Sequence, residues 1–147
     1  MTDSASPPGL FDRPALVIDP GFHTTPINSA DVDAAGKIAV TGAIDGTVRV
    51  WSVVDGVLRK TIRLPRGPGD VGKVYAVAIS PDGELVAVGG WTRWSEADPQ
   101  EQIYIFSAIS GMMRQRIERL PNCVKDLAFS PAGDRLAAVL SAGGIRL

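Results

Sequence analysis

One pattern recurs three times along this chain. An apolar triplet at relative positions −5, −2 and 0 precedes a turn that contains glycine, and a second apolar run follows the turn. The three copies are Ile27-Ala30-Val32 before Gly36, Val74-Val77-Ile79 before Gly83, and Val124-Leu127-Phe129 before Gly133. These glycines are 47 and 50 residues apart. Such spacing is typical of repeated supersecondary units, each of which must bury its apolar faces against a neighbour.

The apolar runs inside each unit are short and end at Gly, Asp or Pro, which is typical of β-strands and not of helices. We therefore expect an all-β meander with two four-stranded sheets and most of a third. The expected strands are 27–32, 37–41, 47–51 and 57–64 in the first unit, 74–79, 85–88, 103–106 and 112–120 in the second, and 124–129, 136–140 and 145–147 in the third.

Prolines support the same register. Pro20, Pro65 and Pro121 each follow a short apolar strand, at spacings of 45 and 56 residues. The longer second spacing matches a polar segment, 91–101, between the second and third strands of the second unit. On this register, residues 16–18 are a fourth strand that lacks its first three.

Composition narrows the function classes. Residues 1–13 are rich in Ser, Pro and Asp and are expected to be a flexible segment, with the folded part at 14–147. The net charge is −1 and Lys and Arg form no cluster, so we expect no nucleic-acid partner. No stretch is apolar enough for a signal peptide or a membrane span, so the chain is expected to be cytoplasmic.

Three turn-rich segments resemble WD40 repeats. They are Ser80-Pro81-Asp82-Gly83, Ser130-Pro131-Ala132-Gly133, and the stretch from Asp45 through Gly46 to Trp51. The resemblance runs from about residue 15 to the end and implies a partial WD40-type β-propeller, with blades at about 24–64, 73–120 and 122–147. It also implies that residues 16–18 form the N-terminal closing strand of the ring.

The same resemblance implies a buried hydrogen-bond network. Blades of this family often carry a chain of His, Ser or Thr, Asp and Trp, and His23, Thr41, Asp45 and Trp51 occupy those positions in the first blade. The second blade departs from the pattern, because Phe106 stands in the place of the tryptophan. The sequences of the blades are also similar to those of bacterial WD40 propellers, some of which are fused to caspase-like peptidase domains.

The implied ring is incomplete. Propellers close with about four to eight blades, so we expect the chain to be a fragment of a longer propeller. The alternative is self-association through the unclosed blade edges, in which two copies exchange N-terminal strands to make six blades.

Signals for catalysis are few. His23 beside Asp45 would suit a general base, but the structural network accounts for both residues. Cys123 is the only cysteine, so it cannot form an intrachain disulfide, and we expect it to be a small buried hydrophobe. The glycine-rich segment 66–72 lacks the Lys-Ser or Lys-Thr pair of a phosphate loop. We predict no catalytic residue, cofactor or metal, and therefore no enzyme.

Loop geometry indicates where a partner would bind. In an up-and-down meander, the loops 65–72 and 91–101 emerge at the same end of the second blade. Tryptophan and arginine are enriched in binding hot spots, and the predicted contact residues are Arg66, Asp70, Trp91, Arg93 and Trp94. The alternative is that one of these tryptophans covers a blade edge.

We therefore predict a non-catalytic propeller scaffold that binds a protein or peptide. The alternative function is a regulatory or recognition region of a longer bacterial enzyme, such as a caspase-like peptidase. A propeller hydrolase is a third class, and it would need a cluster of acidic or His side chains that this sequence does not show.

Overall fold

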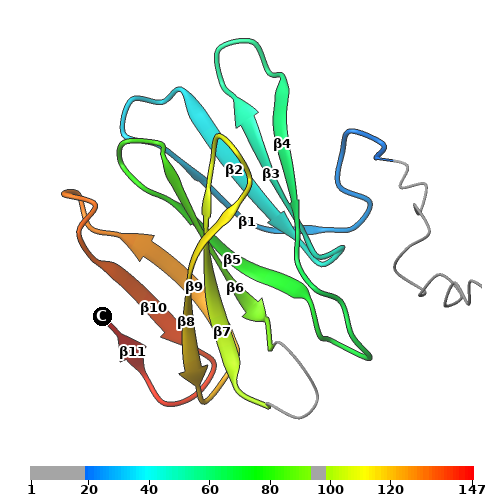
Figure 1. Cartoon of the computed structure of the whole chain (residues 1–147), viewed down its shortest axis with the longest axis vertical. Coiled ribbons are helices and arrows are strands. Elements are labelled where there is room, and N and C mark those ends of the chain that lie inside the picture. The colour runs from blue at the N-terminus through cyan, green and yellow to red at the C-terminus, as the bar shows by residue number, and fades with distance from the viewer. Residues whose placement is uncertain (1–18, 94–98) are drawn as a thin grey trace, which may run out of the picture.

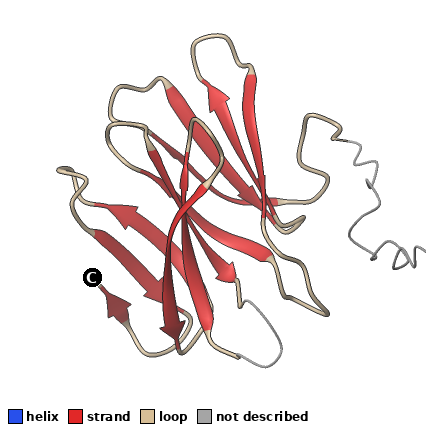
Figure 2. Ribbon diagram, in the orientation of Figure 1, coloured by secondary structure: helices blue, strands red, loops and turns tan. Residues whose placement is uncertain are grey.

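The computed structural model describes residues 19–93 and 99–147, and within them every regular element is a β-strand (Figure 2). The expected all-β fold is confirmed. The strands are β1 (Ile27–Val32), β2 (Ile38–Ala43), β3 (Thr47–Ser52), β4 (Leu58–Arg63), β5 (Lys73–Ile79), β6 (Leu85–Trp91), β7 (Glu101–Ser107), β8 (Met113–Leu120), β9 (Val124–Phe129), β10 (Leu136–Leu140) and β11 (Ile145–Arg146). The predicted flexible segment 1–13, the closing strand 16–18 and Trp94 lie outside the described residues.

Three antiparallel meanders stand side by side (Figure 1). Blade one has the order β1-β2-β3-β4, blade two has the order β5-β6-β7-β8, and the third sheet has the order β11-β10-β9. Strands that are adjacent in sequence are thus adjacent in space, as the turn signals predict. Gly46 and Gly56 close two of the turns in blade one with φ values of 76° and 70°, which favour glycine because other residues rarely adopt them.

Two strands of blade two are longer than the sequence indicates. β6 continues to Trp91 and β7 starts at Glu101, so both limits of the expected polar segment lie within strands. Gly89 and Gly90 weaken the strand signal at the end of β6, and Glu101 and Gln102 weaken it at the start of β7. Both polar side chains are nevertheless buried.

Successive sheets pack against each other through their apolar faces. Val48 and Val50 of blade one share a buried cluster with residues of blade two that include Val77, Val88 and Tyr104. A second cluster joins blade two to the third sheet through residues such as Ala87, Ile105 and Leu127. Burial of aliphatic side chains between successive sheets stabilises each sheet only in the presence of its neighbour.

Glycine permits the closest approach between successive sheets. A Cβ atom at Gly42 in β2 would lie 2.6 Å from Cγ1 of Val74 and from Cγ1 of Val77, both in β5. Gly89 in β6 occupies the equivalent position, and its Cβ would lie 2.7 Å from Val124 in β9. Two adjacent blades therefore use the same device to admit the inner strand of the next sheet.

Polar side chains of β1 also fasten blade one to blade two. The Asn28 amide donates to the carbonyl oxygen of Val74 at 2.9 Å, and the backbone amide of Ile79 donates to Asp31 Oδ2 at 2.9 Å. Ser29 Oγ accepts from the backbone amide of Val77 at 3.1 Å. Asp31 thus lies within β1 and bonds across the junction.

The alternating direction of the strands gives the molecule two ends. The long-loop end carries segments 19–26 and 64–72, the end of β6 and the start of β7, whereas the short-turn end carries the turns 33–37, 53–57, 80–84 and 108–112. In Figure 1 the short-turn end of blades one and two is uppermost.

Candidate functional site

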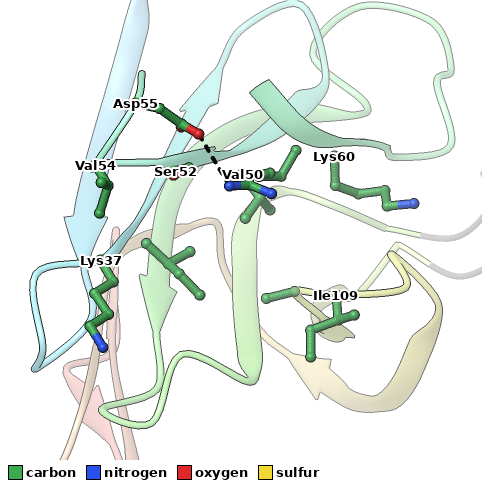
Figure 3. A pocket seen from close by; sticks show the side chains of 10 residues that line it. Lys37, Val50, Ser52, Val54, Asp55, Lys60 and Ile109 are labelled. Carbon is green, nitrogen blue, oxygen red and sulfur yellow. Dashed lines mark hydrogen bonds and ion pairs between the residues drawn. The ribbon is translucent and has the colours of Figure 1, made fainter. Parts of the chain in front are cut away.

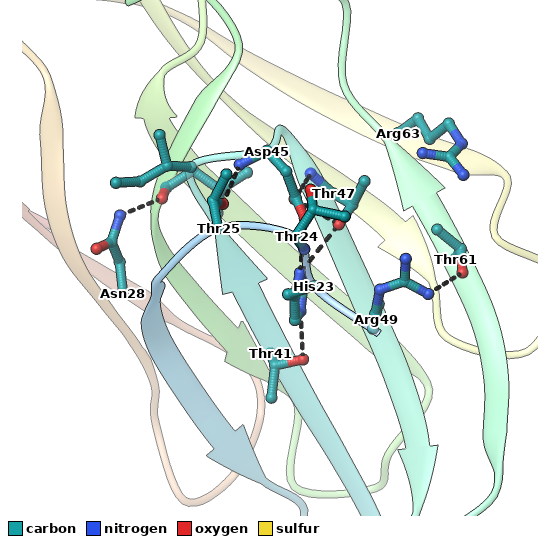
Figure 4. A network of polar contacts seen from close by, with 12 residues as sticks. His23, Thr24, Thr25, Asn28, Thr41, Asp45, Thr47, Arg49, Thr61 and Arg63 are labelled. Atoms are coloured by element: carbon teal, nitrogen blue, oxygen red, sulfur yellow. Dashed lines mark hydrogen bonds and ion pairs between the residues drawn. The ribbon is translucent and has the colours of Figure 1, made fainter. Parts of the chain in front are cut away.

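A chain of polar contacts crosses blade one near the long-loop end (Figure 4). The Trp51 indole N–H donates to Thr41 Oγ1 at 2.8 Å, and Thr41 Oγ1 lies 2.8 Å from His23 Nε2. His23 Nδ1 lies 3.3 Å from Asp45 Oδ2. The structure therefore brings together the four side chains that the resemblance singles out.

The hydrogen bonds of this network all run in one direction, from Trp51 towards Asp45. An indole N–H can only donate, so the Thr41 hydroxyl hydrogen is available for His23 Nε2. That arrangement leaves the imidazole proton on Nδ1, where it faces Asp45 and Thr47 Oγ1, the latter at 3.1 Å. The His23 side chain is 3% exposed, and an imidazole so enclosed satisfies polar groups and is badly placed to reach a substrate.

Thr47 is a member of the network that the sequence analysis missed. Asp45 Oδ1 accepts from the backbone amide of Thr47 at 2.9 Å and from its hydroxyl at 2.6 Å. The threonine directly after Asp45-Gly46 was the available signal, because a hydroxyl two residues beyond an aspartate can bond back to it. Burial acts to raise the pKa of Asp45, but the hydrogen bonds from Thr47, Thr24 and His23 outweigh it and lower that pKa.

A buried arginine extends the polar region along β3. The Arg49 side chain is 2% exposed and pairs with Asp19 at 2.8 Å, and its other terminal nitrogen donates to Thr61 Oγ1 at 3.1 Å. Arg63 reaches the second oxygen of Asp19 at 3.2 Å. The Gly21 backbone amide and Arg49 lower the pKa of Asp19 to about 2. Asp19 thus anchors segment 19–26 to β3 and β4.

Blade two also satisfies buried polar groups near the long-loop end, but with different residues. Thr92 lies 47 residues after Asp45, so it holds the equivalent position. Glu101 accepts from the backbone amides of Thr92 and Arg93, the latter at 2.9 Å, and the Tyr104 hydroxyl donates to the Thr92 carbonyl oxygen at 3.1 Å. Burial raises the pKa of Glu101. The repeat spacing could have located this cluster, although the residue types could not.

Four of the predicted contact residues, Arg66, Asp70, Trp91 and Arg93, are described and lie at the long-loop end. Arg66 is exposed and donates from Nη1 to the Ile44 carbonyl oxygen at 2.9 Å. Asp70 is exposed and pairs with Lys73. The Gly72 backbone amide donates to the Trp91 carbonyl oxygen at 2.6 Å. The end of loop 65–72 therefore lies next to the end of β6, as the strand order requires.

Trp91 and Arg93 are half-buried. Trp91 ends β6 and pairs with Lys73 of β5, so its backbone is fixed within the sheet. Arg93 follows it, and its backbone amide is held by Glu101. Both residues therefore have a backbone that is held in place and a side chain that is partly exposed. The partner role of these residues stays a prediction.

Other chemistry finds little support in the described part of the chain. Residues 19–93 and 99–147 contain no group of three or more His, Cys, Asp or Glu side chains that could hold a metal ion. Cys123 is buried, and burial raises the pKa of its thiol to about 11, so it is a poor nucleophile. The described residues also contain no helix that is long and apolar enough to cross a membrane.

Comparison with known proteins points to one kind of repeat. The WD40 family model, described as WD domain, G-beta repeat, matches residues 20–52 and 60–93. Two segments of the chain are therefore similar to WD40 repeats. The first match contains the His23 network, and the second runs from within β4 to the residues just after β6.

The relatives that this chain matches are longer proteins. A periodic tryptophan protein 2 homolog from Neurospora crassa is 30% identical over 107 residues, which is 72% of this chain and 10% of the relative. Transducin beta-like protein 3 from Rattus norvegicus is 38% identical over 61 residues, or 42% of this chain and 7% of the relative. The chain thus spans about a tenth or less of these two relatives.

Solved structures confirm the WD40 propeller fold. The RRP9 WD40 repeats give a TM-score of 0.63 at 24% identity, over 80% of this chain and 33% of that one. The structure of U3-55K gives a TM-score of 0.65 at 24% identity, over 80% of this chain and 34% of that one. The relatives named here are eukaryotic, and no comparison supports a bacterial origin or a fusion to a caspase-like peptidase.

Proposed function

We propose that this WD40 segment is a non-catalytic scaffold that binds a protein or peptide at its long-loop end. The observation that carries the proposal is the hydrogen bond from the Gly72 amide to the Trp91 carbonyl oxygen, which holds the end of loop 65–72 against the end of β6. WD40 repeats generally mediate contacts between proteins, and loops on a rigid sheet are common sites of recognition.

The contact surface consists of Arg66, Asp70, Trp91 and Arg93, and Trp94 stays part of the prediction although it lies outside the described residues. Arg66 and Asp70 supply opposite charges at the rim, while the half-buried Trp91 supplies apolar area. This pairing of a partly sheltered aromatic side chain with charged neighbours is common among interface hot spots.

Site-specific photo-crosslinking from position 93, followed by calorimetry with the captured partner, tests the proposal. Trp91→Ala should weaken binding at least tenfold while the melting temperature stays unchanged, and Arg66→Ala should weaken it several-fold. Arg135→Ala, a substitution at an exposed arginine of the third sheet, is the matched control. A large loss of stability in Trp91→Ala with unchanged affinity would show that the tryptophan serves packing instead.

Self-association, a cytoplasmic location and the absence of a nucleic-acid partner are further parts of this proposal. β11 is the outer strand of the third sheet, and within the described residues no strand pairs with its outer edge. An unpaired edge can accept another strand. Light scattering over a range of concentrations should show a dimer, and a monomer at all of them would contradict self-association.

A further inference from the structure

A second candidate site lies at the short-turn end, away from the proposed contact surface. A cavity of about 660 Å³ opens between blade one and blade two, with Val50 and Ala108 among its apolar lining residues. Figure 3 shows Lys37 and Val54 on one side of this groove and Lys60 and Ile109 on the other. Its volume falls within the range of sites that hold a small ligand or a short peptide segment.

The walls of the groove are apolar where turns are usually polar. Val54 and Ile109 occupy equivalent positions in the β3–β4 and β7–β8 turns, two residues after Ser52 and Ser107 respectively. Their exposed fractions are 83% and 77%. Polar residues would satisfy both turns equally well, so two branched apolar side chains facing one groove indicate a surface that is covered when a partner binds.

The charged residues around the groove are mostly positive. Lys37, Arg59 and Lys60 line it, and Asp55 is the one acidic residue among its lining side chains. Asp55 is engaged with Arg59 at 3.4 Å. Within the described residues no ion pair is formed by the ammonium groups of Lys37 and Lys60. A chain with a net charge of −1 thus keeps two lysines beside this apolar groove.

Lys60 is also positioned by the fold. A Cβ atom at Gly111 would lie 3.0 Å from Lys60 Cδ and 3.1 Å from Lys60 Cγ, so the lysine stem lies across the glycine of the β7–β8 turn. The aliphatic part of the side chain is therefore supported by blade two although Lys60 belongs to β4 of blade one. A long side chain fixed in this way loses less entropy when its ammonium group binds a carboxylate.

We propose that this groove binds a short acidic peptide segment of a partner protein, with a branched apolar side chain between Val54 and Ile109. Carboxylates on both sides of that side chain would pair with Lys37 and Lys60. The site is separate from the long-loop surface, because the turns and the long loops lie at opposite ends of the same strands.

Fluorescence anisotropy with a defined probe tests this inference on the full chain. The probe is a fluorescein-labelled hexapeptide with two central leucines flanked on each side by two glutamates. It should bind saturably and more weakly as salt is added. A second peptide with lysine in place of glutamate, and a third with glycine in place of leucine, should each bind at least tenfold more weakly.

Matched variants then locate the binding. Lys37→Glu combined with Lys60→Glu should weaken the probe at least tenfold, and Val54→Ser combined with Ile109→Ser should weaken it several-fold. Arg135→Glu, at an exposed arginine of the third sheet's short turn, and Ile145→Ser, at an exposed residue of β11, should leave affinity unchanged. Thermal melts of all variants separate loss of binding from loss of folding.

Three outcomes would overturn the inference. They are no binding by the glutamate probe, equal binding by the lysine and glutamate probes, and unchanged affinity in both double variants. Trp91→Ala provides the distinction from the proposed function, since it should not alter probe binding even if it abolishes recognition at the long-loop end.

Discussion

Individual residues of blade one show how a propeller sheet accommodates polar groups. His23, Thr41 and Trp51 form an unbroken line of donors and acceptors, and Asp45 terminates it. Each member leaves a neighbour unsatisfied when it is removed, so the free energy of unfolding depends on the set more than on any single bond.

Thr41→Val should test that dependence. The change keeps the shape of the side chain but removes the oxygen that serves both the Trp51 indole and His23. The free energy of unfolding measured in urea should fall by about 1–3 kcal/mol. Thr24→Val is the control, because Thr24 is exposed and its contact with Asp45 is made by its backbone amide. An equal loss in both variants would contradict a role for the hydroxyl.

Asp45→Asn should show a loss of stability that depends on pH. A carboxyl whose pKa is lowered on folding contributes stability above its unfolded value of about 4, and that contribution disappears as pH falls through the folded value. The wild type should therefore exceed the variant by about 1–3 kcal/mol at pH 7. The difference should begin to narrow as pH falls below about 4 and should close once pH lies below the folded pKa. Urea titrations at several pH values measure the difference, and a constant gap would contradict the assignment.

The sequence predicts part of this residue-scale chemistry. The four-residue network follows from the resemblance because its residue types and positions match a known pattern. The Glu101 cluster could not be predicted in the same way, since a glutamate after a polar segment looks like part of a solvated loop. Its burial depends on how β7 meets the end of β6, which is a tertiary property.

At the scale of elements, the strands are more predictable than the contacts between them. Alternating apolar runs and Gly-containing turns locate all eleven described strands, because strand period and turn chemistry are local properties. The extra length of β6 and β7 escapes prediction, since Gly89 and Glu101 take their places for packing reasons that a single strand does not reveal. The same holds for Asp31, which bonds to the next sheet.

Gly42→Ala should show how much the close contact between β2 and β5 contributes to stability. The added methyl would lie 2.6 Å from Cγ1 of Val74 and of Val77, so β5 must move away from β2. The free energy of unfolding should fall by about 1–3 kcal/mol. Chemical denaturation of this variant and of the wild type measures the difference in the free energy of unfolding.

A double-mutant cycle identifies the cause of that loss. Val77→Ala removes one of the two colliding methyl groups, so the Gly42→Ala and Val77→Ala effects should be less than additive by about 0.5 kcal/mol or more. Val139→Ala, in the half-exposed part of β10, should add to Gly42→Ala without coupling. Additivity in both cycles would show that the glycine serves some purpose other than close approach.

At the scale of the whole molecule, stability should be unevenly distributed. Blade two is packed on both faces, against blade one through one apolar cluster and against the third sheet through another. β11 is exposed and pairs with β10 through Ala138 and Val139. In repeat proteins, units with two neighbours open less readily than units with one.

Amide hydrogen exchange followed by mass spectrometry should reveal this gradient. Peptides covering β11 should exchange orders of magnitude faster than peptides covering β6, because β11 has few buried contacts to break. β1 should lie between them. Equal protection across the three sheets would show that the molecule opens as a single cooperative unit.

The polar fastening of blade one to blade two has a consequence for what makes their junction specific. Asn28, Ser29 and Asp31 bond to main-chain atoms of β5, not to its side chains. Every strand offers the same amide and carbonyl groups, so these three bonds place little constraint on the sequence of β5. The specificity of the junction must therefore come from its apolar side chains, such as Val74 and Val77 against Gly42.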